Sequence, residues 1–417
     1  MKSVSLSSER HLDTRQKPRI LDRLAFKLVI QQLKKIQLGR LVLIDRDQQF
    51  VFGVEGDLIA RIHIHDRSFY SDIAFGGSIG AGEAYMRGAW SCDDLVTLVR
   101  LLVRNINVVD DMEGGTAALT RPFQKLFHWV NRNTREGARR NISAHYDLGN
   151  DFFSSWLDSS MMYSSAIFPT EDASLHEAQI YRLNHICNQL QLSSSDHLVE
   201  IGTGWGSMAI HAVHNFGCRV TTTTLSLEQY EHTLERVKKA GLEDQITVLL
   251  QDYRDLEGTF DKLVSIEMIE AIGWQQFDTY FAKCGELLKP GGRLLIQAIT
   301  IADQRYENAK RSVDFIQRYI FPGSNLPSIS AMTSSIARKS DLLVTGLEDI
   351  GLHYAKTLRY WRQAFLDQLP LVREMGYSDD FIRMWEFYLC YCEGGFLERA
   401  ISDVHLIADR PLHPYTP

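Results

Sequence analysis

A glycine-rich turn is the first stretch of this chain whose residue types and spacing could bind a cofactor. Gly202, Gly204 and Gly206 follow the apolar run 197–201 and precede the helical run 207–215. Glycine lets the backbone pass tightly beneath a ligand, and the amino terminus of the following helix offers N–H donors to polar groups. The G-x-G-x-G spacing differs from the G-x-G-x-x-G fingerprint of dinucleotide-binding folds. A tight strand-to-helix turn that binds nothing is the structural alternative.

Polar residues after the next two strand-like runs extend this candidate site. Thr224 and Gln229 follow the second run, where they could reach ribose hydroxyls. Asp252 and Tyr253 follow the third, where a carboxylate can accept from an adenine amino group and an aromatic ring can stack on the base. Ligands of open α/β sheets bind at the carboxyl ends of the strands. We therefore expect these residues and the glycine turn to form one nucleoside-binding site.

The elements that must position this site predict an α/β domain over 145–417. Helix-length stretches, among them 183–192 and 227–240, separate apolar β-type runs at 197–201, 218–222, 246–250, 262–266 and 293–298. This alternation is typical of a parallel sheet covered by helices on both faces, a doubly wound Rossmann-like fold. The stretch 303–351 is too long for an ordinary loop and is predicted to be a lid or insertion over the active face.

The first 120 residues predict a smaller α+β domain. A helical pattern covers 21–38, strand-like runs lie at 41–44, 50–54 and 60–64, and an apolar helix is expected at 94–103. Four glycines between Gly76 and Gly82 interrupt the predicted sheet. A basic linker over 121–144 is predicted to join the two domains.

Composition excludes several classes of protein. The chain has 417 residues, 45% hydrophobic and 23% charged, which is globular usage and enough for two cores. Its net charge of −7 argues against general nucleic-acid binding. The six cysteines contain no C-x-x-C pair, so we expect neither a metal site nor a disulfide framework. The amino terminus has no apolar signal-peptide core, and we expect a cytoplasmic protein.

Longer motifs resemble the cyclopropane-fatty-acyl-phospholipid synthase family. They are HYDLGNDFF at 145–153, YSSA at 163–166, QDYRD at 251–255, YIFPG at 319–323 and, in the smaller domain, GAGEAYM at 80–86. The match covers nearly everything after residue 70. It implies that the glycine turn binds S-adenosylmethionine and that Tyr163, Ser164 and Glu200 also contact this cofactor.

The resemblance implies methyl transfer to the cis double bond of a phospholipid acyl chain, followed by proton loss and closure of a cyclopropane ring. Such a reaction needs a dry site that faces a carbocation with aromatic rings and negative charge, and a base beside the added methyl. In the family a bound bicarbonate serves as that base. The alternatives are a methyl-branched, methylene or furan-precursor product without ring closure, and a catalytically inactive module that binds lipid or cofactor.

The family's bicarbonate pocket maps onto five residues of this chain. Glu270 matches the carboxylate that orients the ion, Ile299 the backbone contact and Tyr354 the phenol. Ser165 stands where the family usually has cysteine, and Gln297 where many members have histidine; both can still donate hydrogen bonds, although glutamine cannot share a proton. The structural alternatives are a solvated helix residue for Glu270, a core tyrosine for Tyr354 and a turn residue for Ser165.

Two further stretches bear on the lipid substrate. Large apolar residues between Trp361 and Phe396 suit either ordinary core packing or an acyl tunnel. Basic residues interleaved with aromatic ones are typical of either a peripheral anchor for anionic lipid or a solvated linker helix; they are Arg121, Lys125, Arg132, Arg135, Arg139 and Arg140. We expect peripheral association with the inner membrane surface, unsaturated phospholipid as the partner, and a homodimer as one candidate assembly.

Overall fold

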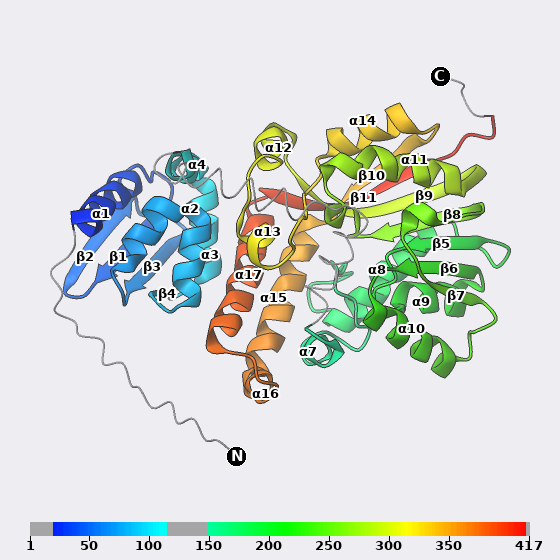
Figure 1. Ribbon diagram of the computed structural model, residues 1–417, viewed down its shortest axis with the longest axis horizontal. Coiled ribbons are helices and arrows are strands. Elements are labelled where there is room, and N and C mark those ends of the chain that lie inside the picture. The colour runs from blue at the N-terminus through cyan, green and yellow to red at the C-terminus, as the bar shows by residue number, and fades with distance from the viewer. Residues whose placement is uncertain (1–19, 115–147, 414–417) are drawn as a thin grey trace, which may run out of the picture.

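The computed structural model describes residues 20–114 and 148–413, which form two sheets of different size. A four-stranded sheet lies at one end of the molecule and a seven-stranded sheet at the other, with helices α15 (Gly351–Asp367) and α17 (Asp379–Leu397) between them (Figure 1). The predicted linker 121–144 and the residues His145, Tyr146 and Asp147 lie outside the described residues.

The smaller unit combines a mixed sheet with four helices. The sheet has the order β2-β1-β3-β4; β1 pairs antiparallel with β2 and parallel with β3. Its elements are α1 (Ile20–Leu33), β1 (Arg40–Asp45), β2 (Gln48–Gly53), β3 (Ile59–Ile64), α2 (Ser68–Met86), β4 (Trp90–Cys92), α3 (Leu95–Arg104) and α4 (Ile106–Gly114). All three predicted strands are present. The glycine-rich interruption is the helix α2, which kinks at Gly77; a Cβ at Gly82 would lie 2.5 Å from the Phe315 ring, so this helix needs glycine for close packing.

The larger sheet confirms the predicted α/β fold class. Its order is β10-β11-β9-β8-β5-β6-β7, in which β9, β8, β5, β6 and β7 run parallel. The strands are β5 (His197–Ile201), β6 (Arg219–Thr224), β7 (Ile246–Leu250), β8 (Phe260–Ile266), β9 (Leu288–Ile301), β10 (Leu343–Asp349) and β11 (Ile401–Asp409). The sequence predicted the five parallel strands but not the antiparallel pair β10 and β11. Strand order reverses beside β5, the position where doubly wound sheets bind ligands.

Helices cover both faces of this sheet because side chains alternate along its buried strands. Leu198 and Val264 pack with α8, α9 and α10, whereas Val199 and Leu263 pack on the opposite face with α11 and α14. The helices of this part of the chain are α7 (Asn150–Ser154), α8 (Leu175–Gln189), α9 (Ser207–Phe216), α10 (Leu227–Ala240), α11 (Phe277–Leu287), α12 (Asp303–Ala309), α13 (Phe315–Tyr319), α14 (Ile329–Lys339), α15, α16 (Leu369–Glu374) and α17; three short 3-10 helices are η2 (Tyr253–Asp255), η3 (Ile269–Ala271) and η4 (Trp274–Gln276). The stretch 303–351 therefore holds α12, α13, α14 and the edge strand β10.

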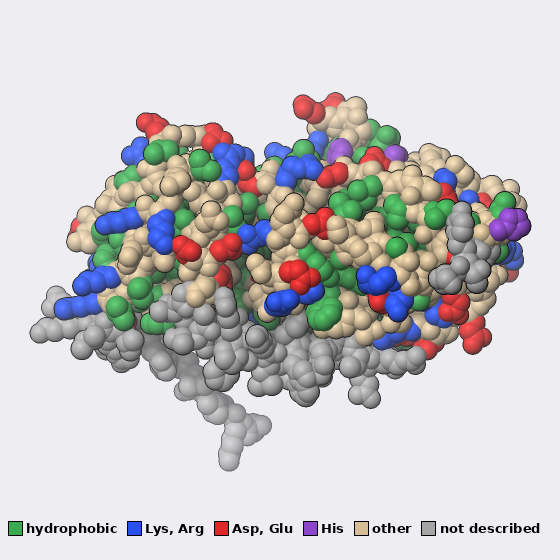
Figure 2. Space-filling view, turned by 90° about the horizontal axis from the view of Figure 1, so that it is seen from above, with side chains coloured by type: hydrophobic (Ala, Val, Ile, Leu, Met, Phe, Trp, Pro, Cys, Tyr) green, Lys and Arg blue, Asp and Glu red, His purple; other side chains and the backbone are tan. Residues whose placement is uncertain are grey.

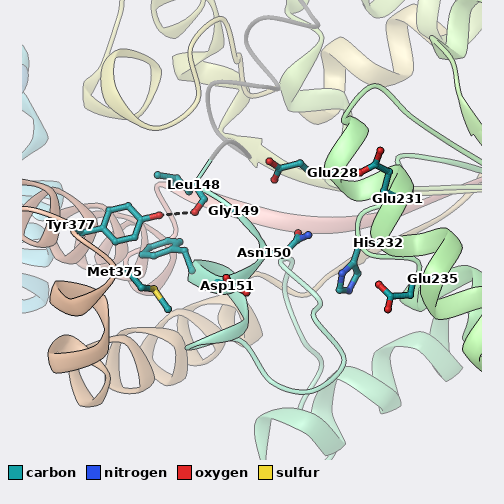
Figure 3. Close-up of a pocket in the computed structure, with 11 residues that line it drawn as sticks. Leu148, Gly149, Asn150, Asp151, Glu228, Glu231, His232, Glu235, Met375 and Tyr377 are labelled. Atoms are coloured by element: carbon teal, nitrogen blue, oxygen red, sulfur yellow. Dashed lines mark hydrogen bonds between the residues drawn. The ribbon is translucent and has the colours of Figure 1, made fainter.

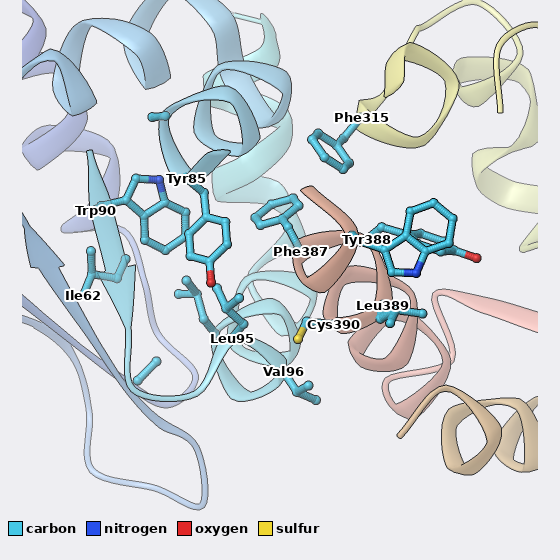
Figure 4. Close-up of a cluster of buried hydrophobic side chains, with 14 of the residues drawn as sticks. Ile62, Tyr85, Trp90, Leu95, Val96, Phe315, Phe387, Tyr388, Leu389 and Cys390 are labelled. Atoms are coloured by element: carbon cyan, nitrogen blue, oxygen red, sulfur yellow. The ribbon is translucent and has the colours of Figure 1, made fainter. Parts of the chain in front are cut away.

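Helix α17 joins the two units through one continuous core. Tyr85 and Trp90 of the smaller unit pack against Phe387 of α17 (Figure 4), and the Tyr85 hydroxyl donates to Glu386 Oε2 at 3.0 Å. A Cβ at Gly394 would lie 2.7 Å from Val99 Cγ1, so glycine lets α17 approach α3 closely. The smaller unit is thereby fixed against a helix that also reaches the candidate site.

The apolar residues between Trp361 and Phe396 form an aromatic core with α7. The Trp156 ring centroid lies 5.9 Å from those of both Trp361 and Trp385, and Phe152 lies 5.0 Å from Trp385. Fully buried members are Trp361, Phe365, Trp385 and Phe396, whereas Leu366, Leu369, Phe381, Met384 and Tyr391 are partly buried. Core packing is therefore confirmed for this stretch, and the acyl tunnel stays a prediction.

Charged side chains of both signs are interspersed over the face seen in Figure 2. In the two described ranges, no helix combines the length and apolar composition needed to span a bilayer.

Candidate active site

The glycine turn joins β5 to α9 with a backbone that glycine adopts easily. The φ angles of Gly202, Gly204 and Gly206 are 102°, 53° and 83°. Gly206 is the N-cap of α9, and a Cβ on it would lie 2.6 Å from Thr233 Cγ2. Position 206 therefore requires glycine both for its backbone angle and for space.

Thr224 and Gln229, the predicted ribose contacts, lie together in the structure. Asp252, the predicted adenine contact, forms an ion pair with Arg254. Thr224 Oγ1 donates to Gln229 Oε1 at 2.9 Å across the end of β6. Asp252 accepts from Arg254 Nε at 2.8 Å, and Tyr253 lies beside it in η2. The Asp252 carboxylate is thus held in a fixed orientation at the carboxyl end of the sheet.

Three predicted cofactor residues carry buried polar atoms that have no hydrogen-bond partner among the described residues. They are Ser164 Oγ, Glu200 Oε2 and the Tyr253 hydroxyl. Burial raises the pKa of Glu200 to about 8, while a hydrogen bond from Thr222 opposes this shift. Buried polar groups are nearly always hydrogen-bonded, so such atoms mark places where a ligand can bind. The residues present therefore offer polar groups that a polar ligand such as a nucleoside would satisfy.

Tyr163 connects this site to the aromatic core. Its hydroxyl lies 2.9 Å from the hydroxyl of Tyr388, and its ring packs against Trp156 and Trp361. Phe153 in turn lies 5.1 Å from Trp205 of the glycine turn. Aromatic side chains therefore extend from the turn to α15 and α17.

Three of the predicted catalytic residues meet at a glutamate that the sequence did not single out, Glu267. The Ser165 backbone N–H donates to Glu267 Oε1 at 2.8 Å, and Gln297 Nε2 donates to the same oxygen at 2.8 Å. The Tyr354 hydroxyl donates to Glu267 Oε2 at 2.7 Å. Ser165, Gln297 and Tyr354 are buried, whereas Glu267 is only partly buried. The carboxylate of Glu267 is thus the common acceptor of this cluster.

The orientation of Gln297 is fixed by Arg182. Arg182 donates to Gln297 Oε1 at 3.0 Å, and because a guanidinium only donates, the Gln297 NH₂ group must face Glu267 and Asp403. Burial lowers the pKa of Arg182 to about 10, which leaves it cationic at neutral pH. Burial and the neighbouring Glu267 raise the pKa of Asp403 well above its usual value. The charge of Glu267 thus favours the protonated form of Asp403, whereas Arg182 and the donors around Glu267 favour the ionised form of Glu267.

Glu270 lies beside this cluster in η3 and has one uncommitted oxygen. Its Oε1 accepts a hydrogen bond from the backbone N–H of Ile299, and the resemblance had assigned both residues to the same pocket. Its Oε2 has no hydrogen-bond partner among the described residues. Burial, with a smaller effect from Glu267, raises the pKa of Glu270 to about 8. Glu270 is consequently mostly protonated at neutral pH, but it can ionise when a positive charge develops nearby.

Ser165 contacts the cluster through its backbone only. Its hydroxyl is buried and donates to the carbonyl oxygen of Ala166 at 3.0 Å. We therefore expect Ser165→Cys, which keeps the backbone donor and a similar volume, to retain kcat within about twofold of wild type. Steady-state release of the demethylated cofactor checks this, with Ser165→Ala as the matched variant that lacks a side-chain donor but keeps the backbone donor. Loss of activity in both variants would show that the hydroxyl itself takes part.

The additional members of the cluster come from distant elements. Glu267 follows β8, Arg182 lies on α8 and Asp403 on β11. The one signal available in the sequence was a second acid, three residues before Glu270, at the carboxyl end of a buried strand. Arg182 and Asp403 carry no comparable local pattern.

A separate cleft of about 710 Å³ opens between the loop at Leu148 and helix α10. Tyr377 and Asp151 line one side, and Glu231, His232 and others from α10 line the opposite side (Figure 3). The Tyr377 hydroxyl donates to the Leu148 carbonyl at 2.6 Å. Because none of the predicted site residues lines this cleft, it is distinct from the carboxylate cluster.

Comparison with known proteins identifies the family of this chain. The family described as mycolic acid cyclopropane synthetase matches residues 133–406. Tuberculostearic acid methyltransferase UfaA1 of Mycobacterium tuberculosis is 38% identical over 329 residues, which cover 77% of this chain and 76% of that protein. Cyclopropane-fatty-acyl-phospholipid synthase of Escherichia coli K12 is 35% identical over 356 residues, 84% of this chain and 88% of the relative.

A solved structure shows the same fold. The cyclopropane synthase MmaA2 of Mycobacterium tuberculosis is 28% identical, covers 65% of this chain and 98% of its own, and superposes with a TM-score of 0.61. The same values hold for the mycolic acid cyclopropane synthase CmaA1, solved in complex with SAH and CTAB. This chain belongs to the mycolic acid cyclopropane synthetase family and is an S-adenosylmethionine-dependent methyltransferase.

Proposed function

We propose that this methyltransferase adds a methylene bridge to the cis double bond of an unsaturated phospholipid acyl chain and so forms a cyclopropane fatty acid. The observation that carries the proposal is the carboxylate cluster around Glu267, which lies beside the glycine turn. β5 and β8 are paired neighbours with Glu200 opposite Val264, so the turn after Ile201 and the acid after Ile266 end at the same edge of the sheet. The proposed methyl donor and the acidic groups would thus lie at the same end of the sheet, where the strand order reverses.

The cofactor site is proposed to consist of the glycine turn, the Thr224–Gln229 pair and the atoms of Ser164, Glu200 and Tyr253 that lack a hydrogen-bond partner within 20–114 and 148–413. S-adenosylmethionine, when bound, supplies an electrophilic methyl group on a sulfonium. Each of the three partnerless atoms would gain a hydrogen bond from or to a ligand there, which offsets the cost of burying it. Tyr163 would then form the wall of the cofactor site that faces the aromatic core.

The acyl chain is proposed to lie against the aromatic residues around Trp156. Rings stabilise a developing carbocation through their negative faces and exclude water, which would otherwise trap the cation. Glu267 and an ionised Glu270 add negative charge on the same side. These residues together meet both demands of the reaction.

Ring closure balances without a further reactant. The π electrons of the double bond form a C–C bond to the methyl carbon while the C–S bond breaks and its electron pair stays on sulfur. A carboxylate then removes a proton from the added carbon, and the released C–H pair closes the ring on the cation. A saturated methyl branch would need a reductant in addition, which argues against it as the product of this chain alone.

An open-chain methyl or methylene product is the second candidate, and the names of the relatives favour it. The 38% identical relative is a methyltransferase rather than a cyclopropane synthase, and a 36% identical protein of Pseudomonas putida is described as a probable fatty acid methyltransferase. Proton loss from a neighbouring chain carbon would leave a methyl-substituted alkene, and a 1,2-hydride shift followed by proton loss from the added carbon would leave a methylene group.

Deuterium-labelled cofactor distinguishes these products. With phospholipid vesicles that contain one cis double bond per acyl chain and a cofactor carrying a CD₃ group, ring closure leaves two deuterium atoms in the lipid and no olefinic proton signal. A methylene product also keeps two deuterium atoms but retains olefinic proton or carbon signals, and a methyl-substituted product keeps three. Mass spectrometry and proton NMR of the extracted lipid measure both quantities. A product with three deuterium atoms would contradict cyclopropane formation.

A further inference from the structure

Three of the five groups that the resemblance assigns to bicarbonate already donate to a carboxylate of the chain, and the other two, Glu270 and Ile299, hydrogen-bond to each other. Ser165 N–H, Gln297 Nε2 and the Tyr354 hydroxyl all donate to the two oxygens of Glu267. Both oxygens of Glu267 therefore occupy the positions that the oxygens of a planar anion would take on these donors. A second anion in the same place would lack donors and would lie against an ionised glutamate, so bicarbonate does not fit this cluster.

We infer that Glu267 is the base of the methyl-transfer reaction and that this enzyme works without bicarbonate. The inference rests on the proposed function, since it assigns the proton acceptor of that reaction. Glu267 would take the proton from the added carbon after the C–S bond has broken, and the C–H electron pair would close the ring. The proton then resides on a Glu267 oxygen until product leaves and water accepts it.

Glu267 lies at the carboxyl end of β8, the edge of the sheet at which the proposed cofactor turn also lies. As a whole residue it is less buried than Glu270, Gln297, Tyr354 and Asp403. Gly202 of the proposed cofactor turn is also close, because a Cβ on it would lie 3.4 Å from the side chain of Met268, the residue after Glu267. A base must reach both the cofactor methyl and the substrate, and Glu267 lies where it could.

The backbone at Glu267 points to a role for the side chain. Its φ is +48°, in the left-handed region that glycine adopts without cost and that other residues adopt only at a cost. Residues held in this region often lie at functional sites, where the surrounding structure maintains them. A glycine here would relieve the backbone, so the presence of glutamate is explained by its carboxylate rather than by the backbone conformation.

The charges around Glu267 suit a base. Arg182 from α8 contributes a positive charge, Tyr354 from α15 donates a hydrogen bond, and Asp403 from β11 and Glu270 from η3 are the neighbouring acids. Burial raises the pKa of Glu267, and the donors from Ser165 and Tyr354 with the charge of Arg182 oppose the rise. An ionised carboxylate with a raised pKa is a stronger base than one in water.

The test uses the full-length protein with vesicles of cis-unsaturated phospholipid, in buffer freed of carbon dioxide and again with added bicarbonate. For the wild type we expect the rate of cofactor demethylation to change by less than about twofold between these conditions. A wild-type rate that collapses without bicarbonate and returns with it would overturn the inference.

Two variants separate the carboxylate from the space it fills. Glu267→Gln keeps the shape but lacks a basic oxygen, and we expect a turnover loss of about 10²-fold or more that bicarbonate does not restore. Glu267→Gly removes the side chain and frees its donors, so we expect a similar loss that added bicarbonate partly reverses. Gln191→Gly is the matched control, because position 191 also has a positive φ, of 55°, but lies outside the cluster. Near-wild-type turnover of Glu267→Gln would contradict the inference.

Binding gives a readout that does not depend on catalysis. Carbon-13 NMR of labelled bicarbonate is expected to detect binding to Glu267→Gly and none to the wild type or to Gln191→Gly. Bicarbonate bound by the wild type, or not gained by Glu267→Gly, would contradict the inference even if no substrate were turned over. If the wild type demethylated no cofactor with any unsaturated phospholipid, the proposed function would fail, whereas this binding comparison would still show whether Glu267 occupies the position of the anion.

Discussion

Replacing Glu270 with glutamine is expected to reduce kcat by about 10²-fold to 10³-fold while the affinity for S-adenosylmethionine changes less than about twofold. Glu270 accepts from the Ile299 backbone through one oxygen and has a second, buried oxygen without a partner among the described residues. Glutamine resembles the protonated side chain that predominates in the resting enzyme, so the fold and cofactor site are preserved. It cannot ionise as positive charge develops on the substrate, and the transition state therefore loses stabilisation.

Single-turnover kinetics and calorimetry with the cofactor measure the two quantities separately. Equal losses in kcat and in cofactor affinity would place Glu270 in the cofactor site instead. Gln275→Glu is a control on the neighbouring 3-10 helix η4: it alters an exposed side chain outside the cluster and is expected to leave both quantities unchanged.

The Glu270→Gln variant also tests the protonation of Glu270, through the dependence of its Tm on pH. The pKa of this carboxyl is raised from 4.5 in the unfolded chain to about 8 in the fold. Between these values the folded protein holds a proton that the unfolded chain has released, so the contribution of Glu270 to stability falls as pH rises through this window. Glutamine does not titrate. The Tm of Glu270→Gln minus that of wild type should therefore increase from pH 5 to pH 8; a constant difference would show that Glu270 is ionised throughout.

The second large effect is expected at the glycine turn, where Gly206→Ala should abolish measurable cofactor binding and lower the free energy of unfolding by about 2–4 kcal/mol. Position 206 has a φ of 83°, and the new methyl group would lie 2.6 Å from Thr233 Cγ2. Thr233 is fully buried on α10 and cannot swing into solvent, so the turn must move. Movement of the turn would displace the N–H groups at the start of α9. Calorimetry with cofactor and chemical denaturation check the two effects.

Two comparisons separate backbone strain from steric clash at this turn. Gly241→Ala has a similar φ of 67° with no atom within 4 Å of the added Cβ, so it should lose only about 1 kcal/mol and retain cofactor binding. Adding Thr233→Ser to Gly206→Ala removes the clashing methyl group but keeps the hydroxyl that donates to Gly204, and should restore part of the binding. Identical behaviour of Gly206→Ala and Gly241→Ala would exclude the clash.

Local patterns in the sequence determined the parts of this protein whose physics is local. The apolar runs at 197–201 and 246–250 coincide with β5 and β7, because a buried strand needs a short apolar segment whatever its neighbours are. The glycine turn was also predictable, since its backbone angles restrict the residue type. The matched motifs then indicated the family, which the comparisons confirm.

Only the tertiary structure decided how the acidic groups work together. Ser165, Glu267, Gln297, Tyr354 and Asp403 come from five segments that meet when β11 inserts next to β9, and sequence spacing does not encode such long-range contacts. The sequence assigned three of these residues to an added anion, whereas in the fold a glutamate of the chain receives their hydrogen bonds. Which carboxyl is protonated depends on burial and on the distances between charges, and both exist only once the chain has folded.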